Sequence, residues 1–242
     1  MYVFDARIRY SEADCDNRLT LEGLLNYFQD CSTFQSEDLG LGVKYLLDLG
    51  QVWALSSWQI DVKRYPEIGE RVKVGTLPYD FKGFIGFRNF WMEDEDGIQI
   101  AVANSVWTLL DLKTGKPVRP SKEMRDGYRI EPKLEMEYLP RKIAIPEGGE
   151  AGTELVITRH YLDTNHHVNN GQYVKIALDY PEEDFEVRRL RAEYKKQAYL
   201  GDVFCPVVYK REEGYVISLN DRGGKPYAVV ELNGGRKPGG QR

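Results

Sequence analysis

The chain of 242 residues contains an internal repeat, and this repeat constrains its fold more than any other feature. The first match aligns Tyr10-Ser-Glu-Ala-Asp14-Cys-Asp16-Asn-Arg18-Leu19 with Arg159-His-Tyr-Leu-Asp163-Thr-Asn165-His-His167-Val168, at a constant offset of 149 residues. A second aligns residues 61–70 with 193–202, and a third aligns 94–102 with 221–229. Each match is short, but three in the same order predict a duplicated unit.

Each copy is predicted to contain a helix followed by antiparallel strands. In the first copy, apolar residues recur every three or four positions from Leu21 to Cys31, the spacing of an amphipathic helix, with Thr20 as its N-cap. In the second copy we expect the helix near residues 170–178. The predicted strands cover residues 52–62, 71–77, 84–92 and 98–110 in the first copy, and 187–196, 203–210, 215–220 and 227–232 in the second.

Such a helix can bury its apolar stripe only by lying across one face of the sheet. The sequence therefore predicts an α+β fold of the tandem (double) hotdog type, in which each half is a long helix packed on an antiparallel sheet. We expect residues 1–125 to form the N-terminal half, 126–150 a linker rich in proline and charge, and 151–242 the C-terminal half. The tail, residues 234–242, is predicted to be disordered.

Composition argues against several classes of protein. No run approaches the roughly 18 consecutive apolar residues of a membrane span, and the first residues do not resemble a signal peptide, so we expect a cytoplasmic protein. The net charge of -5 argues against nucleic acid as a partner. Cys15, Cys31 and Cys205 have no paired CxxC spacing, so we expect neither a disulfide framework nor a metal site, and no cofactor is indicated.

The most informative stretch is Leu162-Asp163-Thr-Asn165-His166-His167-Val168-Asn169-Asn170-Gly-Gln-Tyr173. It resembles the Leu-Asp-x-Asn-x-His-Val-Asn-Asn-x-x-Tyr signature of the plant and bacterial acyl-acyl carrier protein thioesterases. The resemblance extends to Tyr10-Ser-Glu-Ala-Asp14, to residues 106–117 and to Tyr194-Lys195-Lys196, and so covers most of the chain in the expected order. It implies a double hotdog fold in which the second half holds the catalytic residues and the first half shapes the acyl pocket.

The resemblance implies that Asp163, Asn165 and His167 are the catalytic residues of a thioester hydrolase. Because they alternate along the chain, an extended segment before the helix would place the three side chains on one face. His167 can transfer a proton near neutral pH, Asp163 can orient that ring or activate the water itself, and Asn165 can donate a hydrogen bond. The backbone N–H groups of Asn169 and Asn170, at the start of the predicted helix, are candidate oxyanion donors.

The same residue types also have a purely structural interpretation, because Asp, Asn and His commonly cap helices. For an isolated Asp-x-Asn-x-His we would favour that interpretation, but the family pattern favours catalysis at Asp163 and His167.

This chain departs from the family pattern directly after Tyr194-Lys195-Lys196. Where plant members have adjacent Glu and Cys, this chain has Gln197 and Ala198, which excludes a cysteine nucleophile there and makes Gln197 a candidate water-positioning residue. In the first copy, Asp14, Asp16 and Arg18 occupy the positions of the catalytic trio. Because arginine stays protonated near pH 7, the first half is expected to be catalytically silent.

A basic cluster interrupts the otherwise acidic sequence. Its members are Arg188, Arg189, Arg191, Lys195 and Lys196. A solvated strand face is the ordinary interpretation of such a cluster. Because acyl carrier proteins are acidic, the cluster is also a candidate docking patch for an acyl carrier protein that holds a fatty acyl chain.

The predicted function is hydrolysis of fatty acyl-acyl carrier protein thioesters to free fatty acid and holo-acyl carrier protein, which ends chain elongation. The alternatives are an acyl-coenzyme A thioesterase, a hotdog dehydratase or hydratase, and a non-catalytic protein that binds acyl thioesters. The Asp-x-Asn-x-His spacing and the doubled chain favour the first function. The preferred acyl length and saturation, and the formation of a homodimer, stay open.

Overall fold

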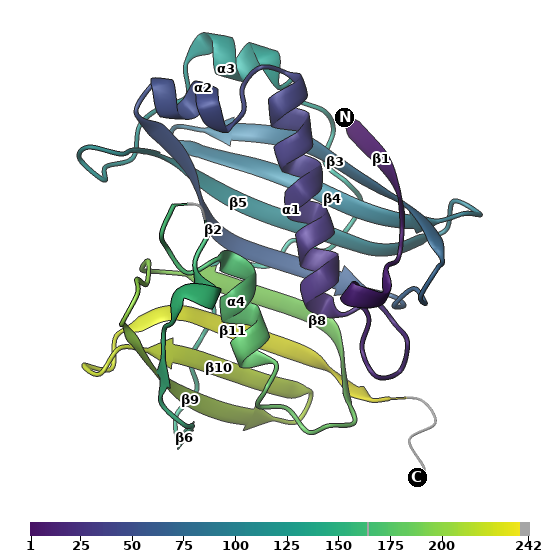
Figure 1. The fold of residues 1–242 in the computed structure, drawn as a ribbon, viewed down its shortest axis with the longest axis vertical. Helices are drawn as coiled ribbons and strands as arrows, with labels where there is room; N and C mark the ends of the chain where they lie inside the picture. The colour runs from purple at the N-terminus through teal and green to yellow at the C-terminus, as the bar shows by residue number, and fades with distance from the viewer. Residues whose placement is uncertain (164, 238–242) are drawn as a thin grey trace. The chain divides into compact units, whose positions relative to one another are not determined.

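The computed structural model describes residues 1–163 and 165–237, and its contacts divide the chain into two compact units. The first comprises Met1–Ser56 with Ile60–Leu139, and the second comprises Ser57–Gln59 with Pro140–Arg242. Residues 126–150, predicted as a linker, are thus divided between the two units. Each unit is a sheet with a helix across one face, as Figure 1 shows for α1 and α4.

The sheet of the first unit has the strand order β1-β3-β4-β5-β2. The strands are β1 (Tyr2–Arg7), β2 (Gln51–Val62), β3 (Arg71–Lys82), β4 (Ile85–Asp94) and β5 (Gln99–Asp111). The pairs β1–β3, β3–β4 and β4–β5 are antiparallel, and the strands predicted for this copy are confirmed. Sequence analysis missed β1, a six-residue strand whose side chains alternate between half-buried and exposed.

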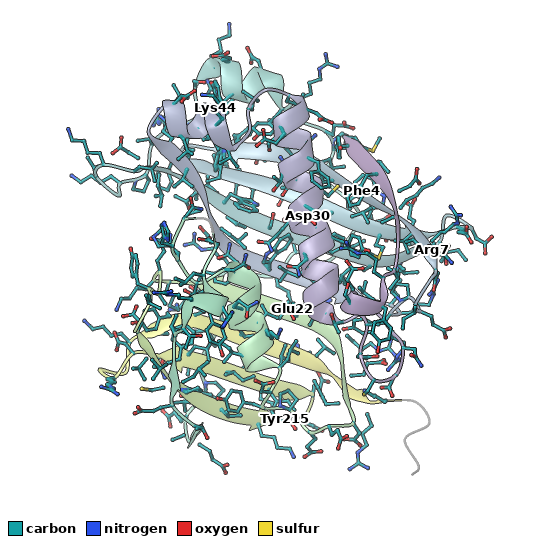
Figure 2. The ribbon with its side chains drawn as sticks, in the orientation of Figure 1. Phe4, Arg7, Glu22, Asp30, Lys44 and Tyr215 are labelled. Carbon is teal, nitrogen blue, oxygen red and sulfur yellow. The ribbon has the colours of Figure 1, made fainter. Side chains whose placement is uncertain are left out.

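Helix α1 (Leu21–Asp38) begins where the sequence predicts, because the Thr20 hydroxyl accepts a hydrogen bond from the Gly23 N–H. Its apolar stripe is buried, and the Phe28 ring packs against Phe90 of β4 with 5.4 Å between centroids. Phe4 of β1 lies beside the same helix (Figure 2) and contacts the rings of Tyr27 and Phe34. Two short helices that sequence analysis missed, α2 (Val43–Asp48) and α3 (Lys122–Gly127), complete this unit.

The sheet of the second unit has the strand order β8-β11-β10-β9-β6, with β7 also paired to β9. The strands are β6 (Glu150–Ala151), β7 (Leu155–Val156), β8 (Phe185–Tyr194), β9 (Val203–Arg211), β10 (Gly214–Asn220) and β11 (Pro226–Arg236). Helix α4 (Asn170–Ala177) contacts β10 and β11 and has eight residues, against 18 in α1.

The predicted disorder of the C-terminal tail is wrong for residues 234–236. These residues belong to β11 and pair with Phe185, Glu186 and Val187 of β8, so their backbone groups are satisfied within the sheet. Residues 238–242 lie outside the part of the chain that the structure describes.

The duplication is confirmed at the level of single backbone hydrogen bonds. The Ile8 N–H donates to Glu70 O at 2.9 Å, and the Ile157 N–H donates to Asp202 O at 2.8 Å. The Gly69 N–H donates to Ile8 O and the Gly201 N–H donates to Ile157 O, both at 2.9 Å. Both glycines have a positive φ, 84° and 86°, which explains why glycine recurs in the second sequence match.

The chain between the units packs against each sheet on the face opposite its helix. In the first unit, Leu134 and Met136 cover Trp91, whose neighbour Phe90 points to α1. In the second unit, Ile143 packs on Val216 and Val229.

Buried charges hold this segment on the second sheet. The Arg191 guanidinium pairs with Glu231 at 2.5 Å and donates to the carbonyl oxygens of Pro140 and Lys142. Glu231 also pairs with Arg211 at 2.7 Å, and Arg211 donates to Ala144 O. Because Arg191 and Glu231 are only 12% and 8% exposed, this pair is largely removed from solvent.

Replacing Arg191 by Met should lower the free energy of unfolding by about 3 kcal/mol, because it leaves the buried Glu231 with one partner fewer and frees two carbonyl oxygens. Urea denaturation measures the effect. Lys210→Met is the matched control, because its ion pair with Glu182 is exposed and should contribute little to stability. Equal losses in the two variants would show that the Arg191 network does not stabilise the unit.

Candidate active site

Asp163 begins a tight loop between a 3-10 turn, η2 (Arg159–Tyr161), and helix α4. Its N–H donates to the His167 carbonyl at 2.7 Å, and its carboxylate Oδ1 accepts the N–H groups of Asn165 at 2.8 Å and His167 at 3.2 Å. His166 closes the loop with a φ of 61°. The expectation of an extended segment with three side chains on one face is therefore wrong, because the carboxylate folds the backbone back on itself.

The first unit contains the same loop between η1 (Tyr10–Glu12) and α1. The Asp14 N–H donates to Arg18 O at 2.8 Å, and Asp14 Oδ1 accepts the N–H groups of Asp16 at 2.9 Å and Arg18 at 3.0 Å. Asn17 has a φ of 60°, close to that of His166. An aspartate at this position thus has a structural role in both units, whatever chemistry the second copy adds.

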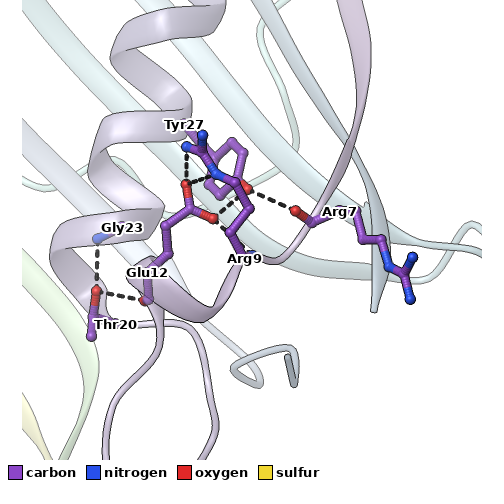
Figure 3. Close-up of polar contacts among 6 residues, drawn as sticks. All are labelled: Arg7, Arg9, Glu12, Thr20, Gly23 and Tyr27. Atoms are coloured by element: carbon purple, nitrogen blue, oxygen red, sulfur yellow. Dashed lines mark hydrogen bonds and ion pairs between the residues drawn. The ribbon is translucent and has the colours of Figure 1, made fainter. Parts of the chain in front are cut away.

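A further network fixes the loop of the first unit (Figure 3). The Glu12 carboxylate accepts hydrogen bonds from Arg9 and, at 2.7 Å, from the Tyr27 hydroxyl. Burial acts to raise the pKa of Glu12, but these hydrogen bonds outweigh it and lower the pKa. In the second unit, Tyr161 and Ile176 occupy the positions of Glu12 and Tyr27, so this network is not repeated there.

The His167 ring lies against Tyr199, edge to face, with 4.9 Å between centroids and 86° between planes. The adjacent backbone is joined as well, because the Val168 N–H donates to Ala198 O at 2.9 Å. The Tyr199 hydroxyl lies 3.5 Å from Gln197 Oε1. The structure thus brings His167 and Gln197 to the same tyrosine.

The side chains of the predicted trio are less closely joined. Asn165 is exposed, whereas Asp163 and His167 are half-buried. Among residues 1–163 and 165–237, no hydrogen bond joins one side chain of the trio to another.

The two predicted oxyanion donors differ in their hydrogen bonding. The Asn169 N–H donates to Tyr161 O at 2.9 Å, and its side chain caps α4 by accepting the Gly171 N–H. Asn169 is therefore a capping residue, and the N–H of Asn170, the first residue of α4, is the stronger candidate donor.

Two buried groups, Tyr173 in the second unit and Cys31 in the first, stay uncharged near neutral pH. The Tyr173 hydroxyl accepts the Ala198 N–H at 3.1 Å, and burial raises its pKa. Burial also raises the pKa of the Cys31 thiol to about 12, so this thiol is no nucleophile at neutral pH. Within the described residues, no group of three His, Cys, Asp or Glu side chains is placed to hold a metal ion.

Most of the basic cluster is paired with carboxylates of the same unit. Arg188 contacts Glu186, Lys195 contacts Glu193 at 2.9 Å, and Lys196 contacts Asp221 at 3.3 Å. Arg191 belongs to the buried network described above, and Arg189 is half-buried. Arg188, Lys195 and Lys196 are the exposed members of the cluster.

Tyr199 is the residue at this site that sequence analysis missed. The second sequence match pairs it with Glu67, and that match was the only signal in the sequence that could have drawn attention to it.

Comparison with known proteins identifies the family. The acyl-ACP thioesterase N-terminal domain model matches residues 2–128, and the C-terminal domain model matches residues 149–227. A relative from Cuphea viscosissima, the chloroplastic acyl-[acyl-carrier-protein] hydrolase FATB3, is 27% identical over 207 residues, 78% of this chain and 50% of that protein. A chloroplastic palmitoyl-acyl carrier protein thioesterase from Cuphea hookeriana is 28% identical over 214 residues, with the same coverage.

Solved structures show the same fold. An acyl-ACP thioesterase from Bacteroides thetaiotaomicron has a TM-score of 0.87 at 24% identity and covers 96% of both chains. The 12:0-ACP thioesterase from Umbellularia californica has a TM-score of 0.82 at 19% identity, over 98% of this chain and 97% of that chain. The predicted tandem hotdog fold is confirmed.

The chain belongs to the acyl-ACP thioesterase family. It spans about half the length of the curated relatives that it matches. None of the helices in the described residues is long and apolar enough to cross a membrane.

The repeat offers a matched test of Asp163. Asp163→Ala and Asp14→Ala should each lower the free energy of unfolding by about 1 kcal/mol, because each removes the acceptor of two backbone N–H groups. Asp163→Asn keeps an acceptor oxygen and should preserve the turn. If the charge serves catalysis, Asp163→Asn lowers kcat at least about 10-fold while Asp14→Asn does not. Normal kcat in Asp163→Asn would restrict this residue to its structural role.

Proposed function

We propose that this protein hydrolyses fatty acyl thioesters of acyl carrier protein and releases the free fatty acid. The observation that supports this most is a half-buried imidazole, His167, presented at the start of α4 within the family signature. An imidazole can take and return a proton near neutral pH, as the attack of water and the departure of a thiolate require.

In the proposed mechanism, His167 takes a proton from the attacking water and later returns it to the leaving thiolate. The N–H of Asn170, at the positive end of α4, donates a hydrogen bond that stabilises the oxyanion as it develops on the carbonyl oxygen of the thioester. Asn165 donates a hydrogen bond from the exposed part of the loop, and Gln197 positions the water. Asp163 holds the loop and supplies negative charge close to His167.

We further propose that the first unit shapes the acyl pocket and takes no part in the chemical step. Arg18, at the position of His167, contacts Asp16 at 3.6 Å and stays protonated near pH 7. The runner-up function, hydrolysis of acyl-coenzyme A, uses the same chemistry and differs in the carrier that docks.

The proposal also includes a cytoplasmic location and leaves a homodimer open. Three free cysteines fit a reducing compartment.

His167→Ala should lower kcat by about 10²–10⁴-fold on acyl-acyl carrier protein, because it removes the proposed proton carrier. Release of the free thiol from palmitoyl-acyl carrier protein and palmitoyl-coenzyme A measures the reaction. Arg18→Ala is the matched control from the first unit and should leave kcat nearly unchanged. Near-normal kcat in folded His167→Ala would overturn the mechanism, and a higher kcat/KM on the coenzyme A substrate would favour the runner-up.

Removing two exposed lysines of the basic cluster tests its role in docking. At low salt, Lys195→Gln with Lys196→Gln should raise KM for acyl-acyl carrier protein about 3- to 10-fold, with little effect on a small acyl thioester. The effect should shrink as salt is added. Lys44→Gln with Lys210→Gln removes the same charge elsewhere and should leave KM unchanged. An equal rise in both double variants would point to net charge instead of a docking patch.

A further inference from the structure

The His167 ring contacts an aromatic residue that comes from another part of the chain. Asp163 Oδ1 accepts backbone N–H groups, and among the described residues no side-chain hydrogen bond holds the imidazole. The Tyr199 ring meets it edge to face at 4.9 Å, within the range of favourable aromatic pairs. We infer that Tyr199 is a positioning residue that fixes the orientation of the His167 ring.

The backbone of Tyr199 is well fixed. Its N–H donates to Asp202 Oδ2 at 2.9 Å, and its carbonyl accepts the Asp202 N–H at 3.1 Å. Its neighbour Ala198 is fully buried and bonded through both its N–H and its carbonyl. Tyr199 is 50% exposed, so its ring covers one side of His167 without forming part of the core.

The first unit shows which part of this arrangement is specific to the second. There, Glu67 occupies the position of Tyr199, and its N–H donates to Glu70 Oε2 at 3.0 Å in an equivalent turn. Glu67 and Arg18 form a backbone bridge, at the positions of Tyr199 and His167. The backbone arrangement is thus repeated in both units, but the side chains differ. Glu67 and Arg18 of the first unit correspond to the aromatic rings of Tyr199 and His167 in the second.

The Tyr199 ring, and not its hydroxyl, orients the His167 imidazole in this proposal. The hydroxyl lies 3.5 Å from Gln197 Oε1, at the long limit of a hydrogen bond. An edge-to-face contact, in contrast, needs only an aromatic ring, which phenylalanine also supplies. A ring held in one orientation offers its nitrogen to the water in a larger fraction of encounters.

This inference rests on the proposed function, and nuclear magnetic resonance tests the contact separately from the reaction. The chain has only three histidines, His160, His166 and His167, so substitution of each assigns the imidazole signals. The His167 signals should move in Tyr199→Leu, which removes the ring, and stay nearly in place in Tyr199→Phe. Tyr10→Leu is the control, because Tyr10 is 86% exposed and belongs to the first unit.

The kinetic arm uses the same variants with acyl-acyl carrier protein. Tyr199→Leu should lower kcat about 3- to 10-fold with little change in KM, and Tyr199→Phe should retain most of the activity. In a His167→Ala background, Tyr199→Leu should cause no further loss, because a positioning residue acts through the residue that it holds.

Three outcomes would overturn the inference: unmoved His167 signals in Tyr199→Leu, equal losses in Tyr199→Phe and Tyr199→Leu, or a full additional loss in the His167→Ala background. The second would assign the role to the hydroxyl, and the third to a direct contact of Tyr199 with substrate. If the unsubstituted protein releases no thiol from any acyl thioester, the proposed function fails, while the magnetic resonance arm still decides whether Tyr199 holds the ring.

Discussion

A single carboxylate oxygen that accepts two backbone N–H groups fixes the loop on which the candidate chemistry depends. Asp163 Oδ1 bonds to the N–H groups of Asn165 and His167, and this turn sets where His167 stands relative to the start of α4. The same geometry around Asp14 in the first unit shows that the turn is a property of the repeated backbone. The candidate site is therefore a modified copy of a structural element.

The two copies differ in what stabilises the loop around that turn. In the first unit, Glu12 binds Arg9 and Tyr27, so charge and a buried hydroxyl hold the chain before α1. In the second unit this network is not repeated, and the backbone bond that joins the loop to Ala198, which the first unit repeats between Leu19 and Pro66, brings Tyr199 to the His167 ring. The second unit thus places an aromatic ring beside His167 where the first unit has the charged residues Glu67 and Arg18 at the corresponding positions.

The two faces of the second sheet pack against different parts of the chain. One face carries α4, whose first turn borders the candidate site, and the other carries the segment after residue 140. Arg191, predicted from sequence as part of a docking patch, lies on this second face and binds Glu231 and two backbone carbonyls. The exposed lysines are left as the members of the cluster best placed to meet a charged partner.

The sequence by itself determined the repeat, the order of the long strands and of the main helix in each copy, and the family. These depend on local periodicity and on residue types at fixed spacing, such as the stripe from Leu21 to Cys31 and the Asp-x-Asn-x-His motif. The tertiary structure decided which atoms meet. The turn that Asp163 makes depends on a positive φ at His166. The buried ion pair of Arg191 and the contact between Tyr199 and His167 depend on residues that are far apart along the chain. Sequence spacing places residues along a strand or loop, but only the folded backbone sets the direction of each side chain.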